Sequence, residues 1–387
     1  MPGCPECVSA CVCSDQIWLV YKGHPMQQFL AAQAASSNSS SPAPPPPPLR
    51  SRPTRREPQQ SVNKEAAAMA DEQQELTRAF SGLGGLGVEE TALVSALGRW
   101  RKQPEKRASF RRGFPGFFSP APTASGGAIT IERCEDEYVR HLKTEFSRFK
   151  NLMVLWAMHP WERDARWAHR ALHKHKKHQG SGCILVELAC TRSAEELLGA
   201  RRAYHALYSR SLEEDVAYRL KETEHAGLLV GLVAAYRYEG ARVSEDLATE
   251  EANAISAKPG NNEVLARVLA TRSKPQLRAT FRIYREIHGK PLEEDLIAVG
   301  GICLQEAVRC LDAPAKYFGE VIAGAFKEGA DKQAKAALTR VVVSRSEADM
   351  EEIKEAYVKQ HGAKLVDAVA KNTHGHYRDA LLAMIGK

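Results

Sequence analysis

The chain has 387 residues, a formal net charge of +7 and a hydrophobic content of 43%, so most of it can bury a core. Residues 1–68 hold six Lys or Arg against three Asp or Glu, a net +3, which leaves only +4 on the other 319 residues. So small a charge argues against a dedicated nucleic-acid-binding protein, and the absence of any run of 18 apolar residues argues against a membrane-spanning helix.

Residues 1–68 have the composition of a segment without a packed core. A Ser-rich run at Ser37–Ser41 is followed by Pro44–Pro48 and by arginines within 50–56, and such runs favour disorder or polyproline conformations. We therefore expect a disordered Pro/Ser/Arg-rich N-terminal extension, with Met69 as the natural start. Its four cysteines are Cys4, Cys7, Cys11 and Cys13. Cys4 and Cys7 have the spacing of one half of a zinc site, but the second half of such a site is missing.

Three short strings later in the chain share one pattern, Thr or Ser followed by Arg and Ser. They are Thr191-Arg192-Ser193, Thr271-Arg272-Ser273 and Ser344-Arg345-Ser346, with the arginines 80 and 73 positions apart. Apolar residues recur 5, 12, 20 and 24 positions after each Arg. Four columns in register across three copies indicate a repeated supersecondary unit.

Local signals predict that each copy is helical. In each copy the Ser is followed three residues later by an acid or an amide, which is the spacing of a capping box at a helix N-terminus. The pairs are Ser193 with Glu196, Ser273 with Gln276, and Ser346 with the shorter Asp349. A later helix opens with acidic residues at Leu212–Asp215 and at Leu292–Asp295, which suits the helix dipole. The repeated Arg could pair with these acids or stay solvated.

A degenerate first copy precedes these three. Thr91–Leu97 matches the helix before the Arg, but Gly98 stands in the Arg column. The register then breaks at 113–130, a Gly- and Pro-rich insertion that we expect to form a loop. Four copies of about 80 residues predict an all-α fold without a sheet. The expected repeats are 69–158 (with the insertion 113–130), 159–240, 241–314 and 315–387.

The repeat resembles the annexin repeat, and the chain from about Asp71 to Lys387 resembles a divergent plant annexin. The strings that carry the resemblance are Trp156–Asp164, Cys190–Ser193, Ala203–His205, Leu212–Asp215, Ala235–Gly240, Leu338–Arg340 and Gly375–Tyr377. The resemblance implies four repeats of about five helices each, forming a curved disc. It also implies calcium-dependent binding of acidic phospholipids such as phosphatidylserine, a cytoplasmic protein peripheral on membranes, and a role in membrane-linked calcium or stress signalling.

Calcium takes six to eight oxygen ligands, and a Gly-rich loop between helices can turn several carbonyls toward the ion. A distant carboxylate then completes the shell, and open positions accept a headgroup oxygen. By resemblance, the ligands in repeat one are Leu83, Gly85, Gly87 and Glu145, the last in competition with Glu135 and Asp136. Val88 replaces the family's Thr, so one hydroxyl contact is lost. The plain alternative is that the glycines only end one helix and start the next.

The other three loops look poorer. We assign His159–Asp164 as the loop of repeat two and Tyr238–Val243 as that of repeat three, and neither contains Gly-x-Gly. Repeat four, at Lys327–Asp331, keeps only Gly329, while His376 stands where the family has its acid. A neutral imidazole is not a hard oxygen ligand, although two acids of that loop could compensate in part. We expect one main calcium site in repeat one and a weak one at Gly329.

Two other function classes compete. The chain has no Gly-x-Ser-x-Gly, no Walker A loop and no His/Cys nucleophile pair, so we predict that it is not an enzyme. The alternative is a calcium-independent helical-repeat scaffold that binds proteins or membranes through a His-rich basic stretch, His169–His178. Within it, His169 and His173 could bind a metal but lack a third ligand. The resemblance also raises self-association and, at Ala266–Val268, a weak match to the family's actin string.

Overall fold

The computed structural model describes residues 70–80, 89–114, 117–120, 132–135, 148–174, 181–223, 226–257, 262–298 and 301–386. The chain divides into two units, Met1–Pro58 and Gln59–Lys387, and all the described residues belong to the second. The predicted extension, 1–68, therefore lies outside the described residues. No helix in the described ranges is long and apolar enough to span a bilayer.

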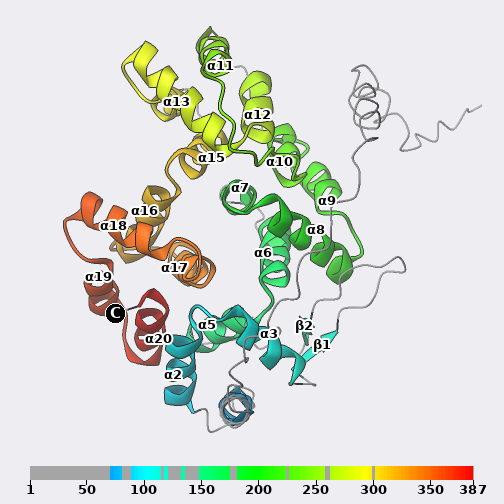
Figure 1. Ribbon diagram of the computed structural model, residues 1–387, viewed down its shortest axis with the longest axis vertical. Helices are drawn as coiled ribbons and strands as arrows, with labels where there is room; N and C mark the ends of the chain where they lie inside the picture. The colour runs from blue at the N-terminus through cyan, green and yellow to red at the C-terminus, as the bar shows by residue number, and fades with distance from the viewer. Residues whose placement is uncertain are drawn as a thin grey trace, which may run out of the picture. The chain divides into compact units, whose positions relative to one another are not determined.

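The described residues form successive groups of helices, which we number as repeats one to four (Figure 1). Repeat one contains a helix at 70–80, α2 (Glu90–Trp100), α3 (Pro104–Arg112) and α5 (Arg148–Ala157). Repeat two contains α6 (Pro160–Lys174), α7 (Ser181–Thr191), α8 (Ala194–Tyr208), α9 (Leu212–Arg219) and α10 (Ala226–Val233).

Repeats three and four have the same order of helices. Repeat three contains α11 (Glu245–Ala257), α12 (Asn262–Thr271), α13 (Lys274–His288), α14 (Leu292–Ala298) and α15 (Ile302–Asp312). Repeat four contains α16 (Pro314–Phe326), α17 (Lys332–Arg345), α18 (Met350–His361), α19 (Leu365–Asn372) and α20 (Gly375–Ile385). The prediction of an all-α fold built from four repeats of about five helices is confirmed.

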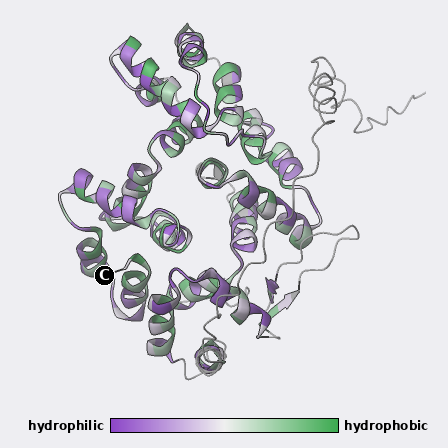
Figure 2. Ribbon diagram, viewed as in Figure 1, coloured by the Kyte–Doolittle hydropathy of each residue, from purple (hydrophilic) through white to green (hydrophobic). Residues whose placement is uncertain are grey.

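Amphipathic faces hold these helices together, and most ribbons in Figure 2 carry both hydrophobic and hydrophilic residues. In α13, Leu277, Phe281 and Tyr284 recur at helical spacing and are all buried. The first helix of a repeat packs along the third, α6 on α8, α11 on α13 and α16 on α18. Between repeats, α7 packs on α15 and α2 packs on α20, so repeat two contacts repeat three and repeat one contacts repeat four.

The capping box predicted at Ser193 is complete. Its Oγ accepts a hydrogen bond from the Glu196 N–H at 3.1 Å, and Glu196 Oε2 accepts one from the Ser193 N–H at 2.8 Å. At Ser273 only half of the box forms, because the side chain of Gln276 bonds the backbone of Ser244 instead.

The box predicted in the third copy is wrong. Helix α17 continues through Arg345, so Ser346 follows a helix instead of starting one. Asp349 precedes α18 but makes no side-chain cap, since its carboxylate accepts two hydrogen bonds from Arg345, both at 2.7 Å. Asp349 therefore pairs with the Arg345 guanidinium, whereas its spacing from Ser346 had predicted a hydrogen bond to the backbone.

The expectation of a loop insertion and no sheet is also wrong in part. Strand β1 (Phe118–Pro120) pairs antiparallel with β2 (Glu132–Cys134) at the edge of repeat one. Phe117 and Phe118 are buried, and the Phe118 ring lies 6.0 Å from that of Phe110. Two buried phenylalanines thus anchor a stretch whose glycines and prolines predicted only a loop.

Candidate calcium and membrane sites

The main calcium site predicted in repeat one lies outside the described residues. Its proposed ligands are Leu83, Gly85, Gly87 and Glu145. The structure does describe the residues that follow the two segments containing them, namely the starts of α2 and α5. Glu90 Oε2 lies 3.7 Å from His376 Nε2, and the ring centroids of Phe149 and His376 lie 6.0 Å apart. The described ends of both segments therefore meet at one side chain, near the start of α20.

The weak site predicted in repeat four can be inspected directly. Gly329 has φ +74°, which a residue with a side chain adopts only under strain, and the Ala330 N–H donates to the Lys327 carbonyl at 3.1 Å. This is a tight turn with glycine at its third position. Among the described residues, nothing donates a hydrogen bond to the carbonyls of Glu328 and Gly329. The turn thus offers free carbonyl oxygens, which suits calcium.

The turn of repeat four has few carboxylates, Glu328 and Asp331. Asp331 Oδ1 accepts the Ala334 N–H at 2.7 Å and caps α17, so it already has a structural role. His376 faces Glu90 and Phe149 of repeat one and brings no carboxylate to the turn. Across the described ranges no three His, Cys, Asp or Glu side chains converge on a metal position. The residues present therefore fit calcium only in part.

The loops assigned to repeats two and three were misplaced. Pro160–Asp164 forms the first turns of α6, and Tyr238–Val243 connects α10 to α11, between two repeats. Proline is favoured at the first position of a helix, so Pro160 starts a helix where the sequence was read as a loop. The segments that join the first and second helices of these repeats are 175–180 and 258–261, which lie outside the described residues.

The described part of the His-rich stretch is a stacked cluster. The ring of His169 lies 3.9 Å from that of His173 and 3.7 Å from that of Tyr208, nearly parallel to both. His173 Nε2 lies 2.8 Å from Asp215 Oδ2, which also accepts the Tyr204 hydroxyl at 2.5 Å. Burial alone would raise the pKa of Asp215, but the hydrogen bonds from Tyr204 and His173 lower it to about 2. The two imidazoles are thus engaged in ring stacking and a hydrogen bond, and a third metal ligand is absent from the described residues.

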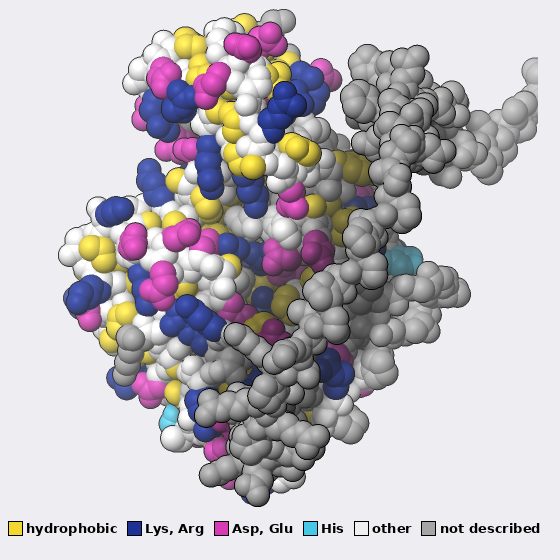
Figure 3. All heavy atoms as spheres, viewed as in Figure 1, with side chains coloured by type: hydrophobic (Ala, Val, Ile, Leu, Met, Phe, Trp, Pro, Cys, Tyr) yellow, Lys and Arg dark blue, Asp and Glu magenta, His cyan; other side chains and the backbone are white. Residues whose placement is uncertain are grey.

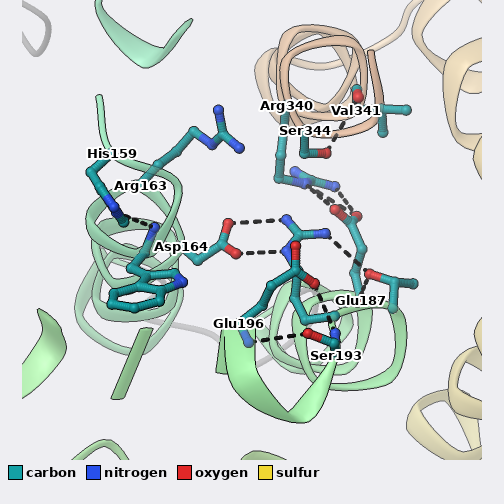
Figure 4. Close-up of polar contacts among 12 residues, drawn as sticks. His159, Arg163, Asp164, Glu187, Ser193, Glu196, Arg340, Val341 and Ser344 are labelled. Atoms are coloured by element: carbon teal, nitrogen blue, oxygen red, sulfur yellow. Dashed lines mark hydrogen bonds and ion pairs between the residues drawn. The ribbon is translucent and has the colours of Figure 1, made fainter. Parts of the chain in front are cut away.

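A cluster of buried ion pairs lies where repeats two and four meet (Figure 4). Arg192 donates two hydrogen bonds to Asp164, at 2.6 and 3.0 Å, and Arg340 donates to Glu187 at 2.8 to 3.1 Å. The pairing of the repeated Arg with the acids of Leu212–Asp215 is therefore wrong. Arg192 instead pairs with an acid on the first helix of its own repeat, as Arg272 does with Glu251.

Sequence reasoning missed this cluster because its partners are far apart in the chain. Asp164 lies 28 residues before Arg192, and Glu187 lies 153 residues before Arg340. The only available signal was the recurrence of the Arg itself. A charged residue that recurs in three repeats at the end of an apolar helix indicates a buried partner.

Comparison with known proteins finds one family throughout. The model of the Annexin family matches residues 248–298 and 325–384. Annexin D4 of Arabidopsis thaliana is 42% identical over 83% of this chain and 99% of its own length. A structure of annexin III superposes with a TM-score of 0.67 at 24% identity, over 82% of this chain and 94% of that one. A calcium-bound structure of annexin (Sm)1 has a TM-score of 0.64 at 20% identity, over 82% and 90% of the two chains. The last two likenesses show the fold alone.

Proposed function

This chain belongs to the annexin family, and on that premise we propose that it binds acidic phospholipid membranes in a calcium-dependent manner, mainly through repeat one. In this proposal the backbone carbonyls of Leu83, Gly85 and Gly87 and the carboxylate of Glu145 hold the ion. Bound calcium would keep open positions for a phosphate oxygen of a lipid headgroup. The protein would act at the cytoplasmic surface of a membrane, peripherally and without enzymatic chemistry.

The observation that carries this proposal is the meeting of Glu90 and Phe149 at His376. Gly87 is three residues from Glu90, and Glu145 is four residues from Phe149. An extended residue spans at most about 3.6 Å, so each ligand lies within about 11 to 14 Å of its described neighbour. The length of these connections therefore permits the glycine loop and Glu145 to hold the same ion.

The competitor Glu135 is less favourable as the closing acid. Its backbone N–H donates to the Phe117 carbonyl at 2.9 Å, which ties it to the β1–β2 hairpin. It also lies 13 residues before the start of α5 at Arg148, whereas Glu145 lies only three residues before it. These differences favour Glu145.

Repeat four is proposed as a weaker, auxiliary site. Its turn at Gly329 can offer carbonyls, but the carboxylate of Asp331 caps a helix. With few carboxylates, the affinity for free calcium should be low, on the order of 10⁻⁴ M or poorer. Since lipid supplies missing ligands, calcium and membrane must each strengthen binding of the other.

The distribution of charge also favours calcium over bulk attraction. In the face shown in Figure 3, basic and acidic side chains are interspersed over the described residues. At physiological salt the field of a surface charge decays over about 8 Å. Opposite charges that lie close together therefore exert little net attraction on a bilayer. A calcium ion bound between the protein and a lipid headgroup is therefore expected to contribute more to membrane binding than the net charge does.

Sedimentation of the full chain with phosphatidylserine vesicles tests the proposal. We expect binding at millimolar calcium and neutral pH, and release by a chelator. Phosphatidylcholine vesicles serve as the uncharged control. Failure to sediment under the calcium condition would overturn the proposal. Binding that needs acid pH and no calcium would instead favour the scaffold alternative and its His-rich stretch, because histidine gains charge near pH 6.

Matched variants then test which residues hold the ion. Gly87→Trp should remove the calcium-dependent component, because a bulky side chain fills the space that the ion needs. Glu145→Gln should raise the calcium concentration at half-maximal binding by about tenfold, a change of about 1.4 kcal/mol. Glu135→Gln is the matched control and should bind like the unmodified chain. If Glu135→Gln raised that calcium concentration and Glu145→Gln did not, the closing acid would be Glu135 of the hairpin.

A further inference from the structure

A cavity of about 250 Å³ lies beside the ion-pair cluster of Figure 4, where repeats two, three and four meet. Its charged lining comes from α6, the α7–α8 corner, and the ends of α13 and α17. These residues are Arg163, Asp164, Arg192, Glu196, Lys274 and Arg345. Ligand pockets for drug-sized molecules measure about 300 to 1,000 Å³, so this cavity suits a small ligand.

The charges of this lining do not cancel. Arg192 neutralises Asp164 through two hydrogen bonds, and Arg345 is neutralised by Asp349. Glu196 is exposed and completes the cap of α8. Arg163 and Lys274 are the other two cations, set against the single charge of Glu196, and neither has a carboxylate within ion-pair distance among the described residues. The carboxylate of Glu239 accepts the Ala194 N–H at 2.7 Å, at the same end of α8.

Arg163 is the more unusual of the two, because it is buried with only 6% of its surface exposed. Its Nε has no hydrogen-bond partner among the described residues, Nη1 makes a long bond of 3.4 Å to the Leu155 carbonyl, and Cζ lies 5.4 Å from the centroid of the Trp167 ring. Figure 4 shows its guanidinium extending from α6 into the space toward α17. The pKa of Arg163 is lowered to about 10. Burial and the charge of Arg192 lower it, and the carboxylate of Asp164 offsets part of this effect. A buried cation left without an anion is costly.

Lys274 approaches the same space from repeat three. Its Nζ donates to the carbonyls of Thr191 and Arg192, at 3.4 and 3.3 Å, which are long contacts. Burial lowers the pKa of Lys274, and the nearby guanidinium groups of Arg237 and Arg345 lower it further. The cavity also adjoins Ser193 and Lys274, which stand at the N-terminal ends of α8 and α13. Helix N-termini add partial positive charge.

We propose that this cavity binds a phosphate-type oxyanion, either free phosphate or the phosphoryl group of a small molecule, held by Arg163 and Lys274. An oxyanion would supply acceptors to the guanidinium of Arg163 and to Lys274, which both line the cavity. Arginine and lysine are the side chains that proteins use for this purpose. The anion would connect α6 of repeat two with α13 of repeat three.

The site is separate from the calcium turn proposed in repeat four. That turn, at Gly329, precedes α17, whereas the cavity contacts Ser344 and Arg345 at the other end of this helix. Helix α17 has 14 residues, so its two ends are about 20 Å apart. Occupancy of the cavity can therefore be measured without calcium and without lipid.

The test is thermal unfolding of the full chain in the presence of chelator. Sodium phosphate should raise Tm in a saturable way, by roughly 2–5 °C at a hundredfold excess over Kd, relative to sodium chloride at equal ionic strength. Glycerol 3-phosphate is the second probe. A rise with inorganic phosphate assigns the site to the free ion, and a rise only with glycerol 3-phosphate assigns it to a phosphomonoester. No rise with either probe overturns the proposal.

Variants separate a binding role from a structural one. Arg163→Met should abolish the phosphate effect and raise the Tm measured without phosphate, because it removes an unpaired buried charge. A residue with a purely structural role would lower that Tm. Lys274→Gln should weaken phosphate binding at least tenfold by calorimetry well below Tm. Lys359→Gln, an exposed position with the same change in charge, is the control and should bind normally. Equal phosphate binding by Lys274→Gln and the control would refute the assignment.

Discussion

Asp215 is a buried carboxylate surrounded by four polar side chains. Besides His173 and Tyr204, it accepts hydrogen bonds from Arg210 and Arg219 at 3.5 and 3.4 Å. Its folded pKa of about 2 lies below the ordinary value of 3.8. An acid with a lowered folded pKa adds stability that is complete above about pH 4 and is lost as the pH falls toward 2.

Asp215→Asn should therefore cost about 1–2 kcal/mol of unfolding free energy at pH 7. The difference between the unmodified chain and the variant should shrink as the pH falls from about 4 to about 2. Urea unfolding at several pH values measures this. The matched control is Asp295→Asn in repeat three, whose carboxylate bonds Tyr284 but is more exposed, so its effect should be smaller. A pH-independent difference for Asp215→Asn would contradict the assignment.

The repeated Arg offers a second comparison at the residue scale. Arg192 is buried against Asp164, whereas one third of the Arg272 side chain is exposed beside Glu251. Arg192→Met should cost about 3–5 kcal/mol, because it leaves a buried carboxylate unpaired. Arg272→Met should cost about 1–2 kcal/mol, because the exposed third of the Arg272 side chain already lets water screen this pair, and Thr280 still donates to Glu251. Denaturant midpoints decide the comparison, and equal losses would show that burial does not set the cost.

At the scale of the element, capping and packing explain where helices start. The complete box at Ser193 satisfies two backbone N–H groups of α8. Ser193→Ala should destabilise the protein by about 1 kcal/mol, measured by chemical unfolding. The control is Ser256→Ala, because this exposed hydroxyl donates only within its own helix. That change should stay within about 0.5 kcal/mol, and a loss at Ser256 equal to that at Ser193 would contradict a specific capping role.

The β1–β2 hairpin shows how packing overrides local signals. Its backbone is held by Glu162, which is fully buried and accepts the Cys134 N–H at 3.0 Å and Arg166 Nε at 2.7 Å. Burial raises the pKa of Glu162, while Arg166 lowers it. The Gly and Pro content of the insertion contained no information about this carboxylate, because Glu162 belongs to α6.

At the scale of the whole molecule, one ion pair connects repeats that are distant in sequence. Arg340 of α17 and Glu187 of α7 are 153 residues apart, and Glu187 is fully buried. Arg340→Met should cost about 3–5 kcal/mol and reduce the cooperativity of thermal unfolding, because repeats two and four lose a direct connection. Differential scanning calorimetry measures both effects. Arg282→Met, which breaks an exposed pair with Glu245, is the control. An equal loss in the control would show that the connection between repeats has no special weight.

The helical repeats and the family could be predicted from local patterns in the chain. Apolar spacing and capping act within about four residues, so they could be read along the chain, and they predicted four helical repeats. The resemblance to annexins implied about five helices in each. The resemblance located the candidate calcium residues. Of these the structure describes only Gly329, which has a positive φ in a tight turn, and its binding of calcium stays a prediction.

The pairing of residues distant in the chain became known from the folded structure. Arg192 paired with Asp164 instead of with Leu212–Asp215, and the hairpin formed where a loop was expected. The meeting of Glu90 and Phe149 at His376 also joins residues from both ends of the repeat array. The physical reason is that a buried charge needs a partner of opposite charge, but the residues near it in the sequence do not show which residue that partner is. Packing between helices determines which partner a buried charge has. It also creates the charged cavity at the junction of three repeats.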